Sequence, residues 1–235
     1  ELKKVNSELD RFVYSASHDL RAPLTSLLGL IQLTKVEDNP EQIKYFLRLQ
    51  ERSIHKLDNF IQDIVNVSKN ARTEIRQDEI DFRKLIEGIF DQLDYMDHAR
   101  QISKKIELLQ HSPFFSDQYR LSIVLNNLLS NAIRYAAPHR KNAYINIMIE
   151  VNHGEALLKI KDNGRGIADE HLEKIFEMFF RTDNDNAGSG LGLYIVKETL
   201  DKLGGEIRVS STLGEGTLFT IKIPSEVPCH SLSNA

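Results

Sequence analysis

Apolar side chains recur at alternating spacings of three and four residues through the first 64 positions, and this periodicity constrains the fold more than any other feature. The first series is Leu2, Val5, Leu9, Phe12, Ala16, Leu20, Leu24, Leu27 and Ile31, and the second is Ile43, Leu47, Ile54, Leu57, Ile61 and Ile64. Between them, Asn39-Pro40 supplies turn and helix-start chemistry. The sequence therefore predicts two long amphipathic helices joined by a short turn, an αα-hairpin.

Each apolar stripe is wider than one partner helix can cover. A hairpin that cannot bury both faces by itself usually pairs with another hairpin. We therefore expect a homodimer through the hairpin, in which two copies form a four-helix bundle. The alternative is that the stripes pack against the rest of the same chain.

Composition and charge exclude several classes of protein. With 41% hydrophobic and 27% charged residues, the chain is typical of an ordinary globular protein. A formal net charge of −4 gives no reason to expect nucleic acid as a partner. The single cysteine, Cys229, rules out an internal disulfide framework and a cysteine-cluster metal site, and favours a reducing, cytoplasmic compartment.

The helical pattern is already running at Glu1, and no signal peptide opens the chain. We therefore expect a fragment, preceded in the full-length protein by a sensor domain or a membrane anchor. No apolar run approaches the ~20 residues that a membrane helix needs. The pattern divides the chain into a hairpin over 1–70, a polar linker over 71–80, a second domain over 81–226 and a C-terminal tail over 227–235.

The second domain mixes helices and strands. Two neighbouring strands separated by VNHGE predict a hairpin, and the whole pattern predicts a mostly antiparallel sheet with helices on one face, an α+β domain. The expected helices cover 81–98, 117–136 and 190–203, and the expected strands cover 106–109, 144–150, 156–162, 206–211 and 217–223.

Three stretches of this domain, NNLLSNAIRY, KDNGRGI and NAGSGLGL, together fit a nucleotide site. Asn127 and Asn131 share a helical face, and an amide oxygen is a hard ligand that suits Mg²⁺. A carboxylate at Asp162 can accept a hydrogen bond from an adenine amino group. Glycines let backbone amides approach a nucleotide, and a helix beginning near Gly190 favours phosphate. Taken singly, each stretch also reads as a cap, a turn or a loop, and the glycines match neither the dinucleotide nor the Walker spacing.

Six stretches in this order resemble the catalytic core of two-component sensor histidine kinases. SHDLRAPL resembles the phosphoacceptor box, NNLLSNAIRY the N box, DNGRGI the G1 box, IFEMFFR the F box and GSGLGL the G2 box, and GEGTLF resembles the last glycine-containing strand entry. The resemblance covers nearly the whole chain. It implies a multi-domain protein, with an all-α hairpin followed by an α+β sandwich ATP-binding domain of the histidine kinase/gyrase type.

The resemblance also implies roles for individual residues of the ATP-binding domain. Asn131 would coordinate Mg²⁺ with help from Asn127, and Asp162 would recognise adenine. The phosphates would meet Arg134 and Arg181, and the adenine or ribose would meet Tyr135, Ile167 and Thr217. The remaining nucleotide contacts would come from Gly164, Gly166, Gly188, Gly190, Leu191 and Gly192. RTDNDN, ahead of the last glycines, is long enough for a mobile lid.

The same resemblance makes His18 the phosphoacceptor. His18 lies two positions past Ala16, about 200° around the helix, so it points away from the apolar stripe. Asp19 would bond one ring nitrogen and stabilise positive charge while the other nitrogen attacks the γ-phosphate. Pro23 cannot donate a backbone hydrogen bond to the carbonyl of Asp19, so we expect a kink there.

The resemblance further implies phosphotransfer to an aspartate of a response regulator receiver domain. Many relatives carry Thr or Asn four residues after the histidine, where it orients a water for dephosphorylation of the regulator; this chain has Ala22, which predicts weak phosphatase activity. One alternative is a hydrolytic ATPase of the same superfold. In those enzymes a glutamate at this position acts as the base for the attacking water, whereas this chain has Asn127. The other is a non-catalytic signalling scaffold.

Overall fold

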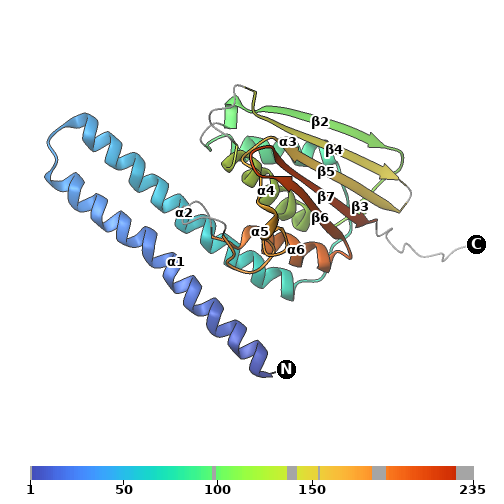
Figure 1. Cartoon of the computed structure of the whole chain (residues 1–235), viewed down its shortest axis with the longest axis horizontal. Coiled ribbons are helices and arrows are strands. Elements are labelled where there is room, and N and C mark those ends of the chain that lie inside the picture. Colours follow the sequence, from blue (N-terminus) through green and yellow to red (C-terminus); the bar gives the residue numbers. More distant parts are fainter. Residues whose placement is uncertain (1, 97–98, 137–141, 153, 182–188, 226–235) are drawn as a thin grey trace, which may run out of the picture. The chain divides into compact units, whose positions relative to one another are not determined.

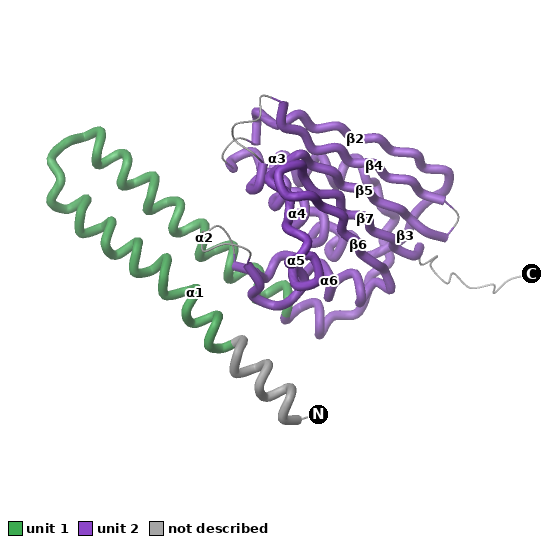
Figure 2. Tube along the Cα trace, in the orientation of Figure 1, with its two compact units in different colours: residues 1–67 green, residues 68–235 purple. Residues whose placement is uncertain are grey.

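The computed structural model describes residues 2–96, 99–136, 142–152, 154–181 and 189–225, with side chains from residue 13 onward. The chain separates into two compact units, Glu1–Val67 and Ser68–Ala235 (Figure 2). None of the described helices is long and apolar enough to cross a membrane.

The first unit is the predicted helical hairpin. Helix α1 covers Leu2–Val36 and helix α2 covers Pro40–Arg72, so α2 continues from the first unit into the second (Figure 1). Asn39 starts α2 because its Oδ1 accepts the backbone N–H of Glu41 at 2.9 Å and its carbonyl accepts that of Ile43 at 3.0 Å. Pro40 occupies the first helical position, where its missing N–H costs nothing.

The hairpin buries only part of its apolar surface. Ala16 and Phe60 are buried, and Gln50 Nε2 donates to Thr34 Oγ1 at 2.8 Å across the two helices. A second set of apolar side chains from both helices is exposed in the single chain: Leu24, Leu28, Leu47, Ile54 and Ile61. The packing of α1 against α2 therefore leaves Leu24 of the first predicted stripe and half of the second stripe, Leu47, Ile54 and Ile61, exposed.

The second unit is built on a five-stranded sheet of order β2-β4-β5-β7-β6, in which β2 and β4 are parallel and the other neighbours are antiparallel. The predicted, mostly antiparallel sheet is confirmed. Its strands are β2 (Ser103–Gln110), β4 (Tyr144–Asn152), β5 (Glu155–Asp162), β6 (Glu206–Thr212) and β7 (Gly216–Pro224). The remaining elements are β1 (Asp78–Glu79), α3 (Phe82–Leu93), a 3₁₀ turn (Ala99–Gln101), β3 (Phe115–Ser116), α4 (Gln118–Arg134), α5 (Asp169–Leu172) and α6 (Gly192–Lys202).

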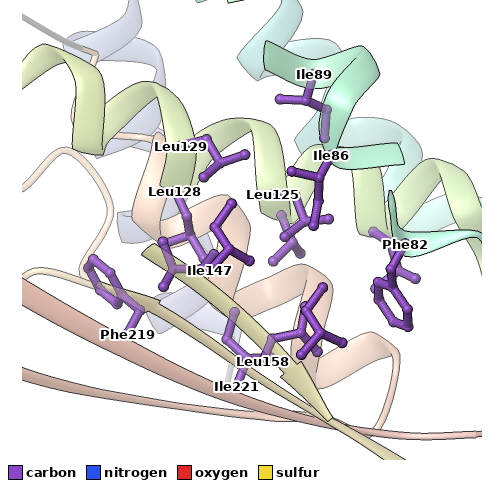
Figure 3. Close-up of a cluster of buried hydrophobic side chains, with 14 of the residues drawn as sticks. Phe82, Ile86, Ile89, Leu125, Leu128, Leu129, Ile147, Leu158, Phe219 and Ile221 are labelled. Carbon is purple, nitrogen blue, oxygen red and sulfur yellow. The ribbon is translucent and has the colours of Figure 1, made fainter. Parts of the chain in front are cut away.

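The core lies between the sheet and the helices. Every second residue of β4 is buried, as period-two alternation requires, and α4 presents a continuous apolar face to the strands. Figure 3 shows how these layers meet, with Leu125, Leu128 and Leu129 of α4 between Ile86 of α3 and strand residues such as Ile147. This packing fixes α4, whose last turn carries the predicted N box.

The polar segment 71–80, predicted as a linker, differs from that expectation. Helix α2 extends to Arg72, and Asp78–Glu79 forms β1, which pairs antiparallel with β3. The boundary between the two units falls after Val67, inside α2. The predicted helix over 81–98 is also shorter, because α3 ends at Leu93, with Asp94 as its C-cap.

Candidate functional site

The SHDLRAPL segment presents an outward-facing imidazole on α1. The side chain of His18 is 73% exposed, whereas Ala16 is 8% exposed, so the predicted outward orientation is confirmed. Asp19 Oδ1 lies 3.3 Å from His18 Nδ1, with the aspartate side chain mostly buried. This contact leaves Nε2 as the ring nitrogen that can act as a nucleophile. Helix α1 includes Pro23 and is assigned as one helix on both sides of it.

In the second unit, Asp162 ends β5 as a partly buried carboxylate. Its Oδ1 accepts the backbone N–H of Gly164 at 2.8 Å and that of Thr217 at 3.3 Å. Burial raises the pKa of Asp162 above its ordinary value, although these backbone N–H groups favour the charged form and oppose the rise. Because both bonds end on Oδ1, Oδ2 is the oxygen suited to accept a hydrogen bond from a ligand.

Ser211, which was not among the predicted site residues, joins the two segments on either side of this carboxylate. Its Oγ donates to Gly216 O at 2.7 Å, accepts from the backbone N–H of Ile167 at 2.8 Å and lies 2.9 Å from Thr217 Oγ1. One hydroxyl therefore joins the G1 loop to the start of β7. A signal was present in the sequence, because Ser211 continues the inward-facing positions of Ile207 and Val209 on β6.

The last turns of α4 carry the predicted N-box residues. Asn131 Oδ1 lies 3.5 Å from Nη1 of Arg134, so the predicted Mg²⁺ ligand and the predicted phosphate contact are neighbours. Asn127 donates its amide to Ile123 O at 2.9 Å. Its Oδ1 would lie 2.7 Å from a Cβ placed on Gly192, so Asn127 packs against the start of α6.

The G1 loop is attached to the end of α4. Tyr135 O accepts the backbone N–H of Arg165 at 3.0 Å, and the Arg165 guanidinium lies 4.2 Å from the centre of the Tyr135 ring. Asn163 adds a second tether, because its side chain accepts from Tyr144 N and donates to Asn142 O. The structure thus brings the predicted N-box and G1-box residues to one end of the sheet.

Glycine is needed at two positions of the site because any side chain there would collide with neighbouring backbone atoms. Gly166 has a φ of +68°, and a Cβ there would lie 2.0 Å from Thr212 O. Gly190 has a φ of +71°, and a Cβ there would lie 2.8 Å from the backbone of Phe179. The expectation that these glycines make room for a nucleotide is therefore incomplete, because larger side chains would already collide with neighbouring loops.

The F box and the G2 box are hydrogen-bonded to each other. The backbone N–H of Phe179 donates to Gly190 O at 3.0 Å, and Arg181 NH2 donates to Ser189 O at 3.3 Å. Ser189 Oγ accepts from the N–H of Leu191, which is fully buried just before α6 begins. Residues 182–186 of the predicted lid, together with Ala187 and Gly188, lie outside the described residues.

Two family descriptions match the chain. The family described as "His Kinase A (phospho-acceptor) domain" matches residues 8–73, and that described as "Histidine kinase-, DNA gyrase B-, and HSP90-like ATPase" matches residues 116–227. The first match covers α1 and α2, and the second covers most of the sheet and the candidate nucleotide site.

Individual proteins agree with these matches. The chain is 32% identical over 231 residues to "Methanogenesis regulatory histidine kinase FilI" of Methanothrix harundinacea (strain 6Ac), covering 95% of this chain but only 26% of that protein. The solved structure of Acinetobacter baumannii histidine kinase AdeS superposes with a TM-score of 0.68 at 28% identity, covering 89% of this chain and 98% of that one. Histidine kinase ThkA, solved in complex with response regulator protein TrrA, shares the fold with a TM-score of 0.73 at 24% identity, covering 95% of this chain and 64% of that one.

Proposed function

Because the chain belongs to the sensor histidine kinases, with a phosphoacceptor hairpin followed by an ATP-binding domain, we propose that it catalyses the ATP-dependent phosphorylation of His18. The observation that carries this proposal is the outward imidazole of His18, with Nδ1 beside Asp19. A neutral ring keeps a lone pair on Nε2 while Nδ1–H donates to the carboxylate.

The proposed step is an in-line displacement. Nε2 of His18 forms a bond to the γ-phosphorus, the bond between that phosphorus and the β–γ bridging oxygen breaks, and ADP leaves with the electron pair. Asp19 stabilises the positive charge that develops on the phosphorylated ring. Because phosphoryl transfer depends mainly on positioning and charge neutralisation, the remaining work falls to the residues that hold the nucleotide.

Recognition of the adenine is assigned to Asp162. Its Oδ1 is held by two backbone N–H groups, and Oδ2 would accept the hydrogen bond of the adenine amino group. Tyr135, Ile167 and Thr217 would line the base and ribose, because the G1 loop and the start of β7 hold them around this carboxylate.

The phosphate end is assigned to the N box and to the loop before α6. Asn131 would hold Mg²⁺ through its amide oxygen, and Mg²⁺ would neutralise charge on the β- and γ-phosphates. Arg134 lies within 3.5 Å of that oxygen and would contact a phosphate, as would Arg181. No group of three or more His, Cys, Asp or Glu that could hold a metal occurs among the described residues, which fits a site completed by amide and phosphate oxygens.

A hydrolytic ATPase of the same superfold is the rival function. That chemistry needs a base at position 127, where this chain has an amide that donates to Ile123 O. The phosphoacceptor match over 8–73 supports the kinase instead, because the hairpin supplies an acceptor.

The deciding experiment incubates the protein with ATP labelled at its γ-phosphate and Mg²⁺. The parent is expected to acquire label that is stable to alkali and lost in acid, and His18→Ala is expected to acquire none while still binding ATP. Equal labelling of both proteins would overturn the assignment of His18. Release of inorganic phosphate without any labelled protein would favour the hydrolase.

Partners follow from the same family. We assign the exposed apolar side chains of α1 and α2 to a homodimer, and the phosphorylated His18 to transfer onto an aspartate of a response regulator receiver domain. The chain spans about a quarter of the length of FilI, so a further sensor domain is expected in the full-length protein, with this region in the cytoplasm.

Ala22 bears on the reverse reaction. It lies one helical turn after His18 and has no polar atom to orient a water. Ala22→Thr is therefore expected to accelerate loss of phosphate from a phosphorylated regulator, with autophosphorylation unchanged. Fast dephosphorylation by the parent would contradict this proposal.

A further inference from the structure

Arg120, in the first turn of α4, is a buried cation that the phosphorylation chemistry does not use. Its side chain is 3% exposed. The guanidinium donates to Asn70 Oδ1 at 3.0 Å, to Thr73 O at 2.8 Å and Thr73 Oγ1 at 2.9 Å, to Glu74 O at 3.1 Å, and to Asp117 Oδ2. Four of these five acceptor atoms belong to three residues at or just after the C-terminal end of α2, namely Asn70, Thr73 and Glu74. Arg120 therefore caps α2 from a distant part of the chain.

Asp117 completes the cluster. Its side chain is 4% exposed, Oδ1 accepts the N–H of Arg120 at 2.9 Å as the N-cap of α4, and Oδ2 accepts the N–H of Arg76 at 3.0 Å. Burial alone would raise the pKa of Asp117, but the Arg76 and Arg120 N–H groups and the Arg120 guanidinium hold that pKa below its ordinary value. A separate bond, from Asn70 Nδ2 to Glu198 O at 3.2 Å, joins the same helix end to α6.

We infer that Arg120 and Asp117 are positioning residues, which make the last turn of α2 a fixed part of the ATP-binding domain and place the hinge of the kinase inside α2, near Val67–Ser68. This inference rests on the proposed function, because the hinge sets how the nucleotide reaches His18. It places the hinge within α2 and not in the polar segment 71–80, which the sequence predicted as a linker.

The reason is that bending the chain at two different places breaks different hydrogen bonds. Opening the polar segment after Arg72 would break the hydrogen bonds from the Arg120 guanidinium to Asn70, Thr73 and Glu74. Bending α2 near Val67–Ser68, where the division between the two units falls, leaves this cluster intact.

The test uses an insertion of two glycines between Gln77 and Asp78, after the last residue that the cluster holds. Spin labels at the exposed positions Lys56 of α2 and Arg208 of β6 report the distribution of distances between the two units. In the parent background the insertion is expected to leave this distribution and the autophosphorylation rate unchanged, because the cluster still fixes α2. In the Arg120→Met background, the same insertion is expected to broaden the distribution and to lower the rate about tenfold.

Two controls separate positioning from general stability. Arg83→Met removes an exposed arginine from α3 and is expected to behave as the parent with and without the insertion. A two-glycine insertion between Val67 and Ser68 is expected to broaden the distribution in both backgrounds. ATP affinity, measured in every variant, is expected to stay at the parent value, since none of these residues is assigned to the nucleotide.

The outcomes are distinct. Broadening by the Gln77/Asp78 insertion in the parent background would overturn the inference, as would an insertion effect of equal size with and without Arg120. If Arg120→Met does not fold, Asn70→Ala combined with Thr73→Val removes the acceptors on the α2 side and takes its place in the same comparison. The distance measurement needs no phosphorylation, so failure of the proposed function would show only as the absence of label on His18.

Discussion

At the scale of single residues, the adenine recognition proposed for Asp162 comes with a loss of stability. A carboxylate whose pKa is raised by burial binds its proton more tightly in the folded protein than in the unfolded chain. Its contribution to stability is therefore complete below the ordinary pKa of an aspartate and is lost as the pH rises through the raised, folded-state value. Burial disfavours the charged form of this carboxylate, and the proposed hydrogen bond to an adenine amino group is a reason for an aspartate to stand there.

The Asp162→Asn variant tests both the recognition and the loss of stability. The amide keeps an oxygen for the N–H groups of Gly164 and Thr217 but presents a donor where Oδ2 was, so ATP affinity is expected to fall about tenfold or more. The melting temperature at pH 7 is expected to equal or exceed that of the parent, and the gain is expected to vanish in acid. Calorimetric ATP titrations and melting curves across pH measure both effects. A large loss of stability at pH 7 would show that the charge itself supports the fold.

Asp19 permits an independent test on the hairpin. Asp19→Asn keeps an acceptor for His18 Nδ1–H but removes the negative charge that is proposed to stabilise the phosphorylated ring. The initial rate of His18 labelling is expected to fall at least about 100-fold, within the range typical of a lost acid–base partner. ATP affinity is expected to stay constant. A parallel fall in affinity would place Asp19 in folding or in nucleotide binding instead.

At the scale of elements, α1 retains a proline that a stable helix would avoid. Pro23 leaves the carbonyl of Asp19, the residue next to His18, without its backbone donor. Pro23→Ala restores that donor and is expected to raise the stability of the hairpin by up to ~3 kcal/mol. The labelling rate of His18 is expected to change, because the segment becomes harder to bend. Melting curves and initial rates check the two effects, and an unchanged rate would remove the case for a functional kink.

At the scale of the whole molecule, the exposed apolar face of the hairpin argues for self-association. Ile54 of α2 is 53% exposed in the single chain, together with Leu24, Leu28 and Leu47. Ile54→Glu is expected to convert a dimer into a monomer, because a buried glutamate without a partner costs several kcal/mol. Light scattering with size-exclusion chromatography measures the mass, and Lys56→Glu at an exposed polar position is the matched control. A monomeric parent would contradict the four-helix bundle.

The parts of this molecule that sequence patterns predicted are those specified locally. The hairpin and strands such as β4 follow from apolar periodicity within a few residues, and the turn at Asn39-Pro40 from the chemistry of two. What was not predicted depends on distant partners. Nothing near Arg120 shows that its guanidinium reaches the carbonyl groups of Thr73 and Glu74, and the two-residue strands β1 and β3 exist only because each pairs with the other.

At the candidate site, too, contacts between residues far apart in the sequence could not be predicted from local patterns. Motifs identified the glycines of the site. They did not show that a side chain at position 166 would collide with the carbonyl oxygen of Thr212, which belongs to strand β6. Ser211 was missed for a similar reason, because it joins the G1 loop to the start of β7, and these two segments meet only in the folded domain. Local sequence patterns thus supply candidate site residues, but not the distant backbone groups and side chains that hold those residues in place.

The cap that Arg120 places on α2 also decides where the protein can be cut. A piece beginning at residue 81 would keep the arginine and Asp117 but discard Asn70, Thr73 and Glu74, and with them most of the acceptors of the guanidinium. A piece beginning at Ser68 retains all of them. The shortest self-sufficient nucleotide-binding portion therefore includes the final turn of a helix that by sequence belongs to its neighbour.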